Sequence, residues 1–234
     1  MSEKLLVPSI EKRLASFLEV SRRNLKGPWR GDKVRPTITI SREFGCEGFP
    51  VTEKLQELLE KQTGDDWTVM DKALLEEVAK HHNLSEELLH NLGEKNRFID
   101  DMVSTFSSRW KSDKDYYRLL CKQIVALSEK GNVIIIGRGA SILTQDKPHC
   151  YHFRMIASQE FKLKSITKRL GIDEDEAEKL IRKKQRQREE FIKDFLNRDV
   201  ADPTLYHLVF NNAKNPADVI AETISHYVST RLKR

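Results

Sequence analysis

The feature that most constrains this fold is the segment from 37 to 60, which reads TITISREFGCEGFPVTEKLQELLE. Its first four residues alternate threonine and isoleucine, and such β-branched runs favour a strand. A turn with Gly45 and Gly48 follows, and apolar residues then recur at the spacing of a helix face. A strand, glycine turn and helix can aim backbone N–H groups at a phosphate, although many such segments are plain connections. The Gly-Lys-Ser/Thr ending of a Walker A loop is absent, because Gly48, Phe49 and Pro50 stand there.

A second constraint is the uninterrupted apolar run from 133 to 136, Val-Ile-Ile-Ile. Such a run is typical of a strand that is covered on both faces of a parallel sheet. Strand-like segments alternate with helical patterns along the chain, near 37–41, 66–70, 132–136, 150–156 and 206–210. This alternation predicts an α/β fold with a five-stranded parallel sheet flanked by helices.

Composition indicates a soluble, helix-rich protein with one main domain. The chain has 234 residues, of which 38% are hydrophobic and 33% are charged. No apolar run reaches the roughly 18 residues of a membrane-spanning helix, and the first residues lack the apolar core of a secretion signal. The three scattered cysteines, Cys46, Cys121 and Cys150, fit the reducing cytoplasm better than a disulfide scaffold, and none has metal-ligand spacing with histidine.

The sequence divides into an N-terminal helical extension with a linker, residues 1–35, and a domain over 36–234. Apolar residues between 8 and 24 lie on one helical face. That face can pack on its own domain, or it can contact a protein partner or a second copy of the chain. Helical spacing of apolar residues between 71 and 110 predicts a helical insertion between strands.

The densest basic run covers residues 182–188 and reads RKKQRQR. It could be a solvated helix face, a cluster that binds nucleotide phosphates, or a patch for nucleic acid. Nucleic acid is the least favoured of the three, because no aromatic residues interleave with the basic ones to stack on bases.

Three motifs in order resemble the cytidylate-kinase-like family, a branch of the P-loop nucleoside monophosphate kinases. They are ITISREFGCEG at 38–48, VIIIGRGA at 133–140, and RQREEFIKDF at 186–195 followed by DPTLYHLVFNN at 202–212. The resemblance covers residues 36–230. It implies an acceptor-binding insertion near 71–110, a lid over 171–200, and transfer of the γ-phosphoryl of ATP to CMP or dCMP with Mg²⁺.

The resemblance also implies roles for particular residues. Asp71 and Arg138 would bind the acceptor. From the lid, Arg188, together with Lys184 one turn earlier, would clamp the transferring phosphoryl. The phosphate loop would consist of Ser41, Arg42, Glu43, Phe44, Gly45, Cys46, Glu47 and Gly48. Several of these assignments have plain alternatives. Asp71 can cap a helix, Arg42 and Glu43 can pair with each other or with neighbours, and Arg188 can be a surface residue of a solvated helix.

The sequence departs from the family pattern in its phosphate loop. Glu47 places a negative charge near the expected phosphates, and Phe49 replaces a usual arginine. If the backbone at position 47 has a positive φ, glutamate also costs more there than glycine. Gln185 and His207 replace residues that are commonly acidic. These departures keep a second function open, a catalytically weak kinase relative that regulates by binding a nucleotide or a protein partner.

Overall fold

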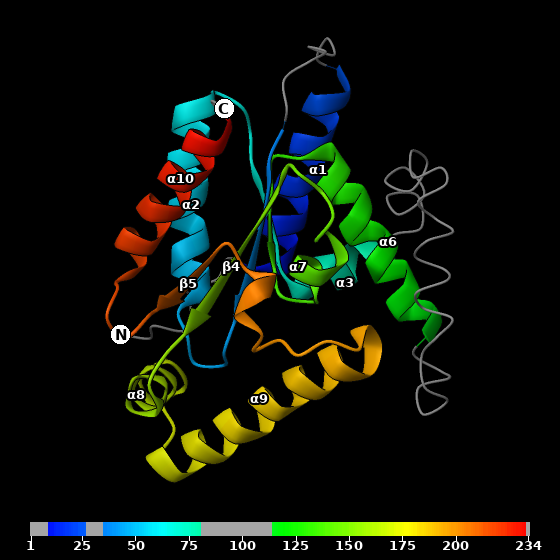
Figure 1. Ribbon diagram of the computed structural model, residues 1–234. Helices are drawn as coiled ribbons and strands as arrows, with labels where there is room; N and C mark the ends of the chain where they lie inside the picture. Colours follow the sequence, from blue (N-terminus) through cyan, green and yellow to red (C-terminus); the bar gives the residue numbers. More distant parts are fainter. Residues whose placement is uncertain (1–8, 27–34, 81–113, 233–234) are drawn as a thin grey trace.

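The computed structural model describes residues 9–26, 35–80 and 114–232, and these form one sheet of five parallel strands (Figure 1). The strands are β1 (Thr37–Arg42), β2 (Thr68–Met70), β3 (Val133–Ile136), β4 (Cys150–Ile156) and β5 (Leu208–Asn211). Their order across the sheet is β2-β3-β1-β4-β5. The predicted five-stranded α/β fold is therefore confirmed, and the apolar run of β3 lies inside the sheet, between β2 and β1.

Helices cover both faces of the sheet. Their bounds are α1 (Ile10–Lys26), α2 (Gly48–Thr63), α3 (Lys72–Lys80), α6 (Lys114–Lys130), α7 (Ala140–Leu143), α8 (Gln159–Leu170), α9 (Glu174–Leu196) and α10 (Ala217–Leu232), with a 3₁₀ turn at Pro203–Leu205. Helices α2 and α10 lie on one face, and α1, α3, α6 and α7 lie on the other (Figure 1). The long helix α9 crosses the carboxyl ends of the strands. Within the described residues, no helix is long and apolar enough to span a membrane.

The two faces of the sheet differ in polarity along β1. Ile38 and Ile40 are fully buried against α2 and α10, whereas the alternating Thr39 and Ser41 point to the opposite face. There, Thr39 Oγ1 lies 2.8 Å from Nδ1 of His152, its register partner on β4. One face is thus an apolar core, and the other becomes polar toward the carboxyl ends of the strands, where open α/β sheets bind ligands.

The N-terminal helix α1 packs on its own domain. Phe17 is buried in the core formed with α3 and α6, and Ile10 and Leu14 pack against the same core. Arg13 forms an ion pair with Asp71 at 2.8 Å. A dimer or partner contact through this helix stays a prediction. Of the predicted insertion, α3 is seen, and residues 81–110 lie outside the described residues.

The buried His152 should make the fold sensitive to acid. Burial and the neighbouring His207 lower the pKa of His152 from 6.5 to about 4. As the pH falls from 6.5 toward 4, the unfolded chain takes up a proton at this residue that the folded chain does not. The free energy of unfolding therefore falls by up to about 3 kcal/mol as the pH drops through this range.

Urea denaturation at a series of pH values measures this loss. In His152→Gln, the free energy of unfolding should change less with pH between 6.5 and 4, because glutamine does not titrate. The same change at His226, an exposed residue, should leave the profile as it is. An equally steep profile in His152→Gln would contradict the assignment.

Candidate functional site

Two cavities meet at the carboxyl ends of the strands. The sheet cavity, of about 410 Å³, lies between the polar face of the sheet and α9, and it is lined by Ser41, Arg138, Arg154 and Lys184 among others. The loop cavity, of about 480 Å³, lies along the turn after β1 and the end of α8. The residues common to both linings are Arg42, Phe44, Asp71, Ile136 and Arg188. Ligands in the two cavities would therefore come together at Arg42 and Arg188.

The turn after β1 requires glycine at position 45, and a second glycine, Gly48, lies against the side chain of Arg42. Gly45 has a φ of 101°, in the region that favours glycine, and a Cβ there would lie 2.7 Å from the Lys162 Cβ. At Gly48, the first residue of α2, a Cβ would lie 2.4 Å from Cδ of Arg42. The Arg42 side chain thus runs directly over the start of α2, beside the backbone N–H groups that could face a phosphate.

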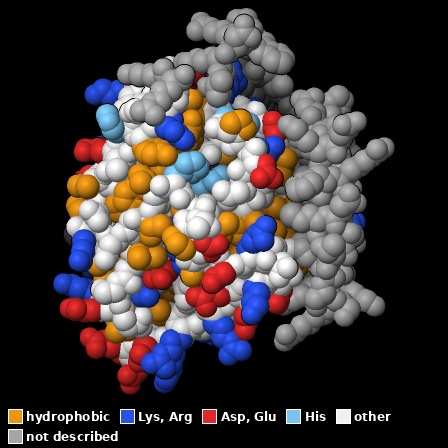
Figure 2. All heavy atoms as spheres, in the orientation of Figure 1, with side chains coloured by type: hydrophobic (Ala, Val, Ile, Leu, Met, Phe, Trp, Pro, Cys, Tyr) orange, Lys and Arg blue, Asp and Glu red, His pale blue; other side chains and the backbone are white. Residues whose placement is uncertain are grey.

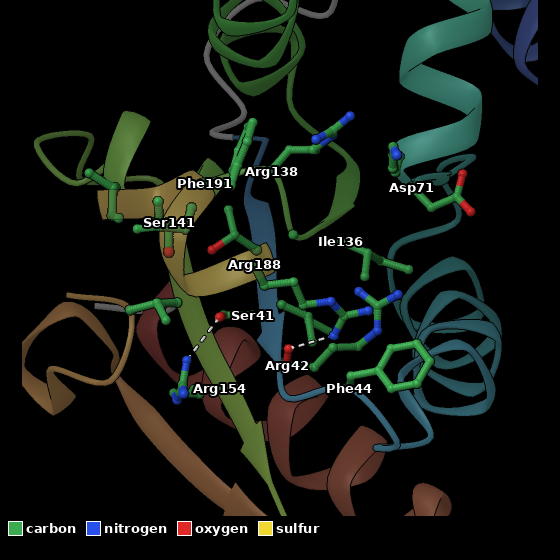
Figure 3. A pocket seen from close by; sticks show the side chains of 18 of the residues that line it. Ser41, Arg42, Phe44, Asp71, Ile136, Arg138, Ser141, Arg154, Arg188 and Phe191 are labelled. Atoms are coloured by element: carbon green, nitrogen blue, oxygen red, sulfur yellow. Dashed lines mark hydrogen bonds between the residues drawn. The ribbon is translucent and has the colours of Figure 1, made fainter. Parts of the chain in front are cut away.

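Arg42 and Arg188 place two positive charges at this junction, and Asp71 is a carboxylate whose charge acts on Arg42. Arg188 donates a hydrogen bond to the Arg42 carbonyl at 3.0 Å and lies over the Phe44 ring at 5.1 Å (Figure 3). Burial lowers the pKa of Arg42, and burial together with the charge of Arg42 lowers the pKa of Arg188 to about 9. Neither forms an ion pair within the described part of the chain. An anion at this junction would remove the cost of holding two cations together.

Glu43 does not provide that anion. It forms an ion pair with Lys162 at 3.1 Å and accepts a hydrogen bond from the Ala157 backbone at 3.3 Å. The alternative of an Arg42–Glu43 pair is therefore not what the structure shows. Glu43 instead ties the turn to α8 and leaves the charge of Arg42 free for a ligand.

Two residues of the turn depart from the family pattern, Glu47 and Phe49, and only Phe49 lines a cavity. Glu47 has a φ of −85°, so its backbone is not in the region that penalises glutamate. Its N–H donates to Asn212 Oδ1 at 2.8 Å, and its side chain lines neither cavity. Phe49 does line the loop cavity. Cys46 is buried, and burial raises the pKa of its thiol to about 11, so it packs as a neutral side chain.

Arg138 lines the sheet cavity, and its charge is already paired. It follows β3 in a glycine turn with a φ of 55°, and its guanidinium forms an ion pair with Glu76 and lies 5.0 Å from the centre of the Phe191 ring. In Figure 3 this guanidinium points away from Ser41. An acceptor at Arg138 would either share the guanidinium with Glu76 or displace Glu76 from it.

Asp71 has a structural role at the edge of both cavities. It accepts a hydrogen bond from the Leu74 backbone at 2.9 Å, which confirms the helix-cap alternative, and it pairs with Arg13. It also lines both cavities, so an acceptor in the sheet cavity could reach it.

Helix α9 divides the basic run into two faces. On the solvent side, Arg182 pairs with Glu178 at 2.6 Å and Arg186 pairs with Glu190 at 2.7 Å, and Figure 2 shows positive and negative side chains mixed at the lower edge of this view. Lys184 lines the sheet cavity on the other side, as Arg188 does. The mixture of charges outside favours the solvated-face and phosphate-binding interpretations over a nucleic-acid patch.

Helix α9, the predicted lid, is packed against the domain at both ends. Ala177 and Ile181, near its start, are buried with Ile166 of α8, and Phe195, near its end, belongs to the main core. The many charged residues of α9 would favour loose packing before Phe191, and the burial of Ala177 and Ile181 shows that this part of the helix is packed instead. Between the ends, α9 spans the sheet cavity.

Gln185 joins the middle of α9 to the turn after β1. Its side-chain oxygen accepts a hydrogen bond from the Phe44 backbone N–H at 2.9 Å. The amide at this position, which the family pattern makes commonly acidic, therefore has a defined role as a contact between lid and loop.

Sequence reasoning missed Arg154. This arginine is buried on β4 and lines the sheet cavity beside Ser41. The available signal was a single arginine inside the strand CYHFRMI, where a charged side chain is otherwise costly.

Comparison with known proteins gives the site its context. A search of curated proteins found no match. Among solved structures, the chain is similar to an uncharacterized protein from Eubacterium ventriosum ATCC 27560, with 23% identity, a TM-score of 0.64, and coverage of 84% of this chain and 99% of the other. It also aligns with shikimate kinase from Bacteroides thetaiotaomicron at 13% identity and a TM-score of 0.42, over 83% of this chain and 98% of that one, and this lower similarity supports no argument about the site.

The family match covers most of the domain. Residues 37–214 match the cytidylate kinase-like family, and this range includes β1 with its glycine turn, the turn that carries Arg138, and the lid helix. The chain therefore belongs to the cytidylate kinase-like family.

Proposed function

We propose that this protein transfers the γ-phosphoryl group of ATP to a nucleoside monophosphate, with CMP or dCMP as the favoured acceptor, in the cytoplasm. The observation that carries the proposal is the meeting of two cavities at Arg42 and Arg188. Phosphoryl transfer depends on positioning donor and acceptor and on neutralising charge between them. Two unbalanced guanidinium groups at the junction suit that requirement.

The loop cavity would hold the ATP phosphates. Backbone N–H groups at the start of α2 and the side chain of Arg42 would contact them, within the turn formed by residues 41–48. Arg188 and Lys184 would approach the transferring group from α9. Transfer forms a bond between an acceptor oxygen and the γ-phosphorus and breaks the bond to the β-phosphate oxygen, which leaves as part of ADP.

The sheet cavity favours an acceptor that is already an anion. Among the described residues that line it, Asp71 is the sole carboxylate, and Arg13 pairs with it. A hydroxyl acceptor needs a base to remove its proton, whereas a phosphate monoester attacks without one. This supports a nucleoside monophosphate over an alcohol as the acceptor.

Magnesium would arrive with the nucleotide. The described residues contain no group of three or more acidic, histidine or cysteine side chains that could hold a metal. Mg²⁺ is commonly held by substrate phosphates with one or two carboxylates, and Asp71 is the carboxylate that borders both cavities. When bound, the ion would neutralise phosphate charge, and Arg42 and Arg188 would do the same from the protein side.

The alternative function is a catalytically weak relative that binds a nucleotide in order to regulate. Phe49 favours it, because an aromatic side chain lines the loop cavity where the family pattern has a cation. The two functions differ in turnover and share nucleotide binding, so activity measurements separate them.

The direct test is a thermal-shift screen of ATP, GTP, CMP, dCMP, UMP and AMP with Mg²⁺, followed by an assay of ADP formation. A ligand of the folded state raises the melting temperature. We expect ATP and CMP or dCMP to give the largest shifts, and the pair to give ADP. Binding without ADP formation would favour the regulator.

Arg188→Gln should lower the rate of transfer by about 100-fold or more, because it removes charge from the junction. Arg182→Gln is the matched control, since Arg182 lies on the same helix with its side chain in solvent. The rates of both variants are compared in the same assay. Equal rates in the two variants would contradict the proposed role of Arg188.

The loop departures yield a second prediction. Phe49→Arg should strengthen ATP binding by about 1–3 kcal/mol, because the new cation faces the loop cavity. Glu47→Gly, which changes a side chain outside both cavities, should have a much smaller effect. Calorimetric titration with ATP distinguishes them. A larger gain from Glu47→Gly than from Phe49→Arg would show that Glu47 is the residue that weakens the loop.

The lid yields a third prediction, measured by hydrogen exchange with and without ATP and CMP. Amides between 182 and 190, which span the sheet cavity, should exchange more slowly when nucleotide binds. Amides of α10, which lines neither cavity, serve as the internal control. Strong protection of α9 without ligand and no response to nucleotide would contradict the assignment of α9 as a lid.

A further inference from the structure

We propose that Arg154 is the residue that recognises the phosphate of the acceptor, with Ser41 beside it. This inference rests on the proposed function and adds a specificity-determining residue to it. Arg154 would act in addition to Arg138.

The first argument is position. Arg154 lies on β4 opposite Ser41 in the register of the sheet, on its polar face. Its side chain lines the sheet cavity, and one guanidinium nitrogen donates to Ser41 Oγ at 3.3 Å (Figure 3). Ser41 directly precedes Arg42, so a group held here would lie next to the junction of the two cavities.

The second argument is charge. Arg154 is 5% exposed, and it forms no ion pair within the described part of the chain. The other charged groups of this cavity include two paired ones, Arg138 with Glu76 and Asp71 with Arg13. A buried cation is costly unless an anion compensates it. Arg154 is thus a preformed anion site, which needs no exchange of partner.

The third argument is orientation. The Arg154 guanidinium lies over the Tyr206 ring at 5.6 Å, and the Tyr206 hydroxyl donates to the Val200 carbonyl at 2.8 Å. These contacts hold the Tyr206 ring in place beside the guanidinium. Arginine has several N–H donors in one plane, which match the oxygens of a phosphate monoester. With Ser41 engaging one of them, the others are available to a ligand.

The test compares CMP with cytidine, which lacks the phosphate, by calorimetric titration of the full chain. Arg154→Gln should weaken CMP binding by about 30-fold or more and leave cytidine binding unchanged, because only the phosphate loses its partner. ATP binding should change little, since Arg154 does not line the loop cavity. Arg182→Gln is again the control and should bind CMP as the wild type does.

Two milder variants keep the test valid if Arg154→Gln does not fold. Arg154→Lys retains the charge but loses the planar set of donors, and it should weaken CMP binding by roughly tenfold. Ser41→Ala should also lower the preference for CMP over cytidine.

Different outcomes separate the two proposals. If the wild type phosphorylates CMP and the Arg154 variants bind CMP as tightly as it does, the role of Arg154 is wrong and the proposed function stands. An equal loss of CMP and cytidine binding would also overturn it, because it would indicate a structural role. If the wild type binds no nucleoside monophosphate, both proposals fall.

Discussion

The close contact between Arg42 and Gly48 is the constraint on which the site depends. Arg42 ends β1, and its side chain crosses the first residue of α2, where even a Cβ would lie 2.4 Å from its Cδ. Its carbonyl accepts the hydrogen bond from Arg188 on the lid helix. One residue therefore joins the central strand, the start of the helix after the turn, and the lid. A larger residue at position 48 would disturb all three together.

The charges of the site fall into two kinds. Arg13, Arg138 and Lys162 have carboxylate partners, and these pairs hold α1, α3 and the phosphate loop in place. Arg42, Arg154 and Arg188 have none within the described residues. Arg154 is buried and Arg42 and Arg188 are partly buried, so the second kind carries a cost that an anionic ligand would offset.

The sequence predicted the strands well and the partners of the charged residues poorly. β-Branched and apolar runs near 37–41 and 132–136 carry their own signal, so the parallel sheet could be derived from them. The pairing of Arg138 with Glu76 depends on residues that are 62 positions apart. Nor did the sequence indicate that the backbone of Glu47 has a negative φ, or that its side chain lines neither cavity. Such facts belong to the tertiary structure, because they depend on which elements come together.

The ion pair between Arg13 and Asp71 extends the influence of the N-terminal helix beyond packing. Arg13 lies before the range that matches the family, while Asp71 borders both cavities. By cancelling the charge of Asp71, α1 keeps the electrostatic potential of the site positive. A substitution that removes Arg13 would therefore change the charge around both cavities, although α1 lies outside the range that matches the family. The N-terminal helix can in this way act on the electrostatic potential of cavities that its own side chains do not line.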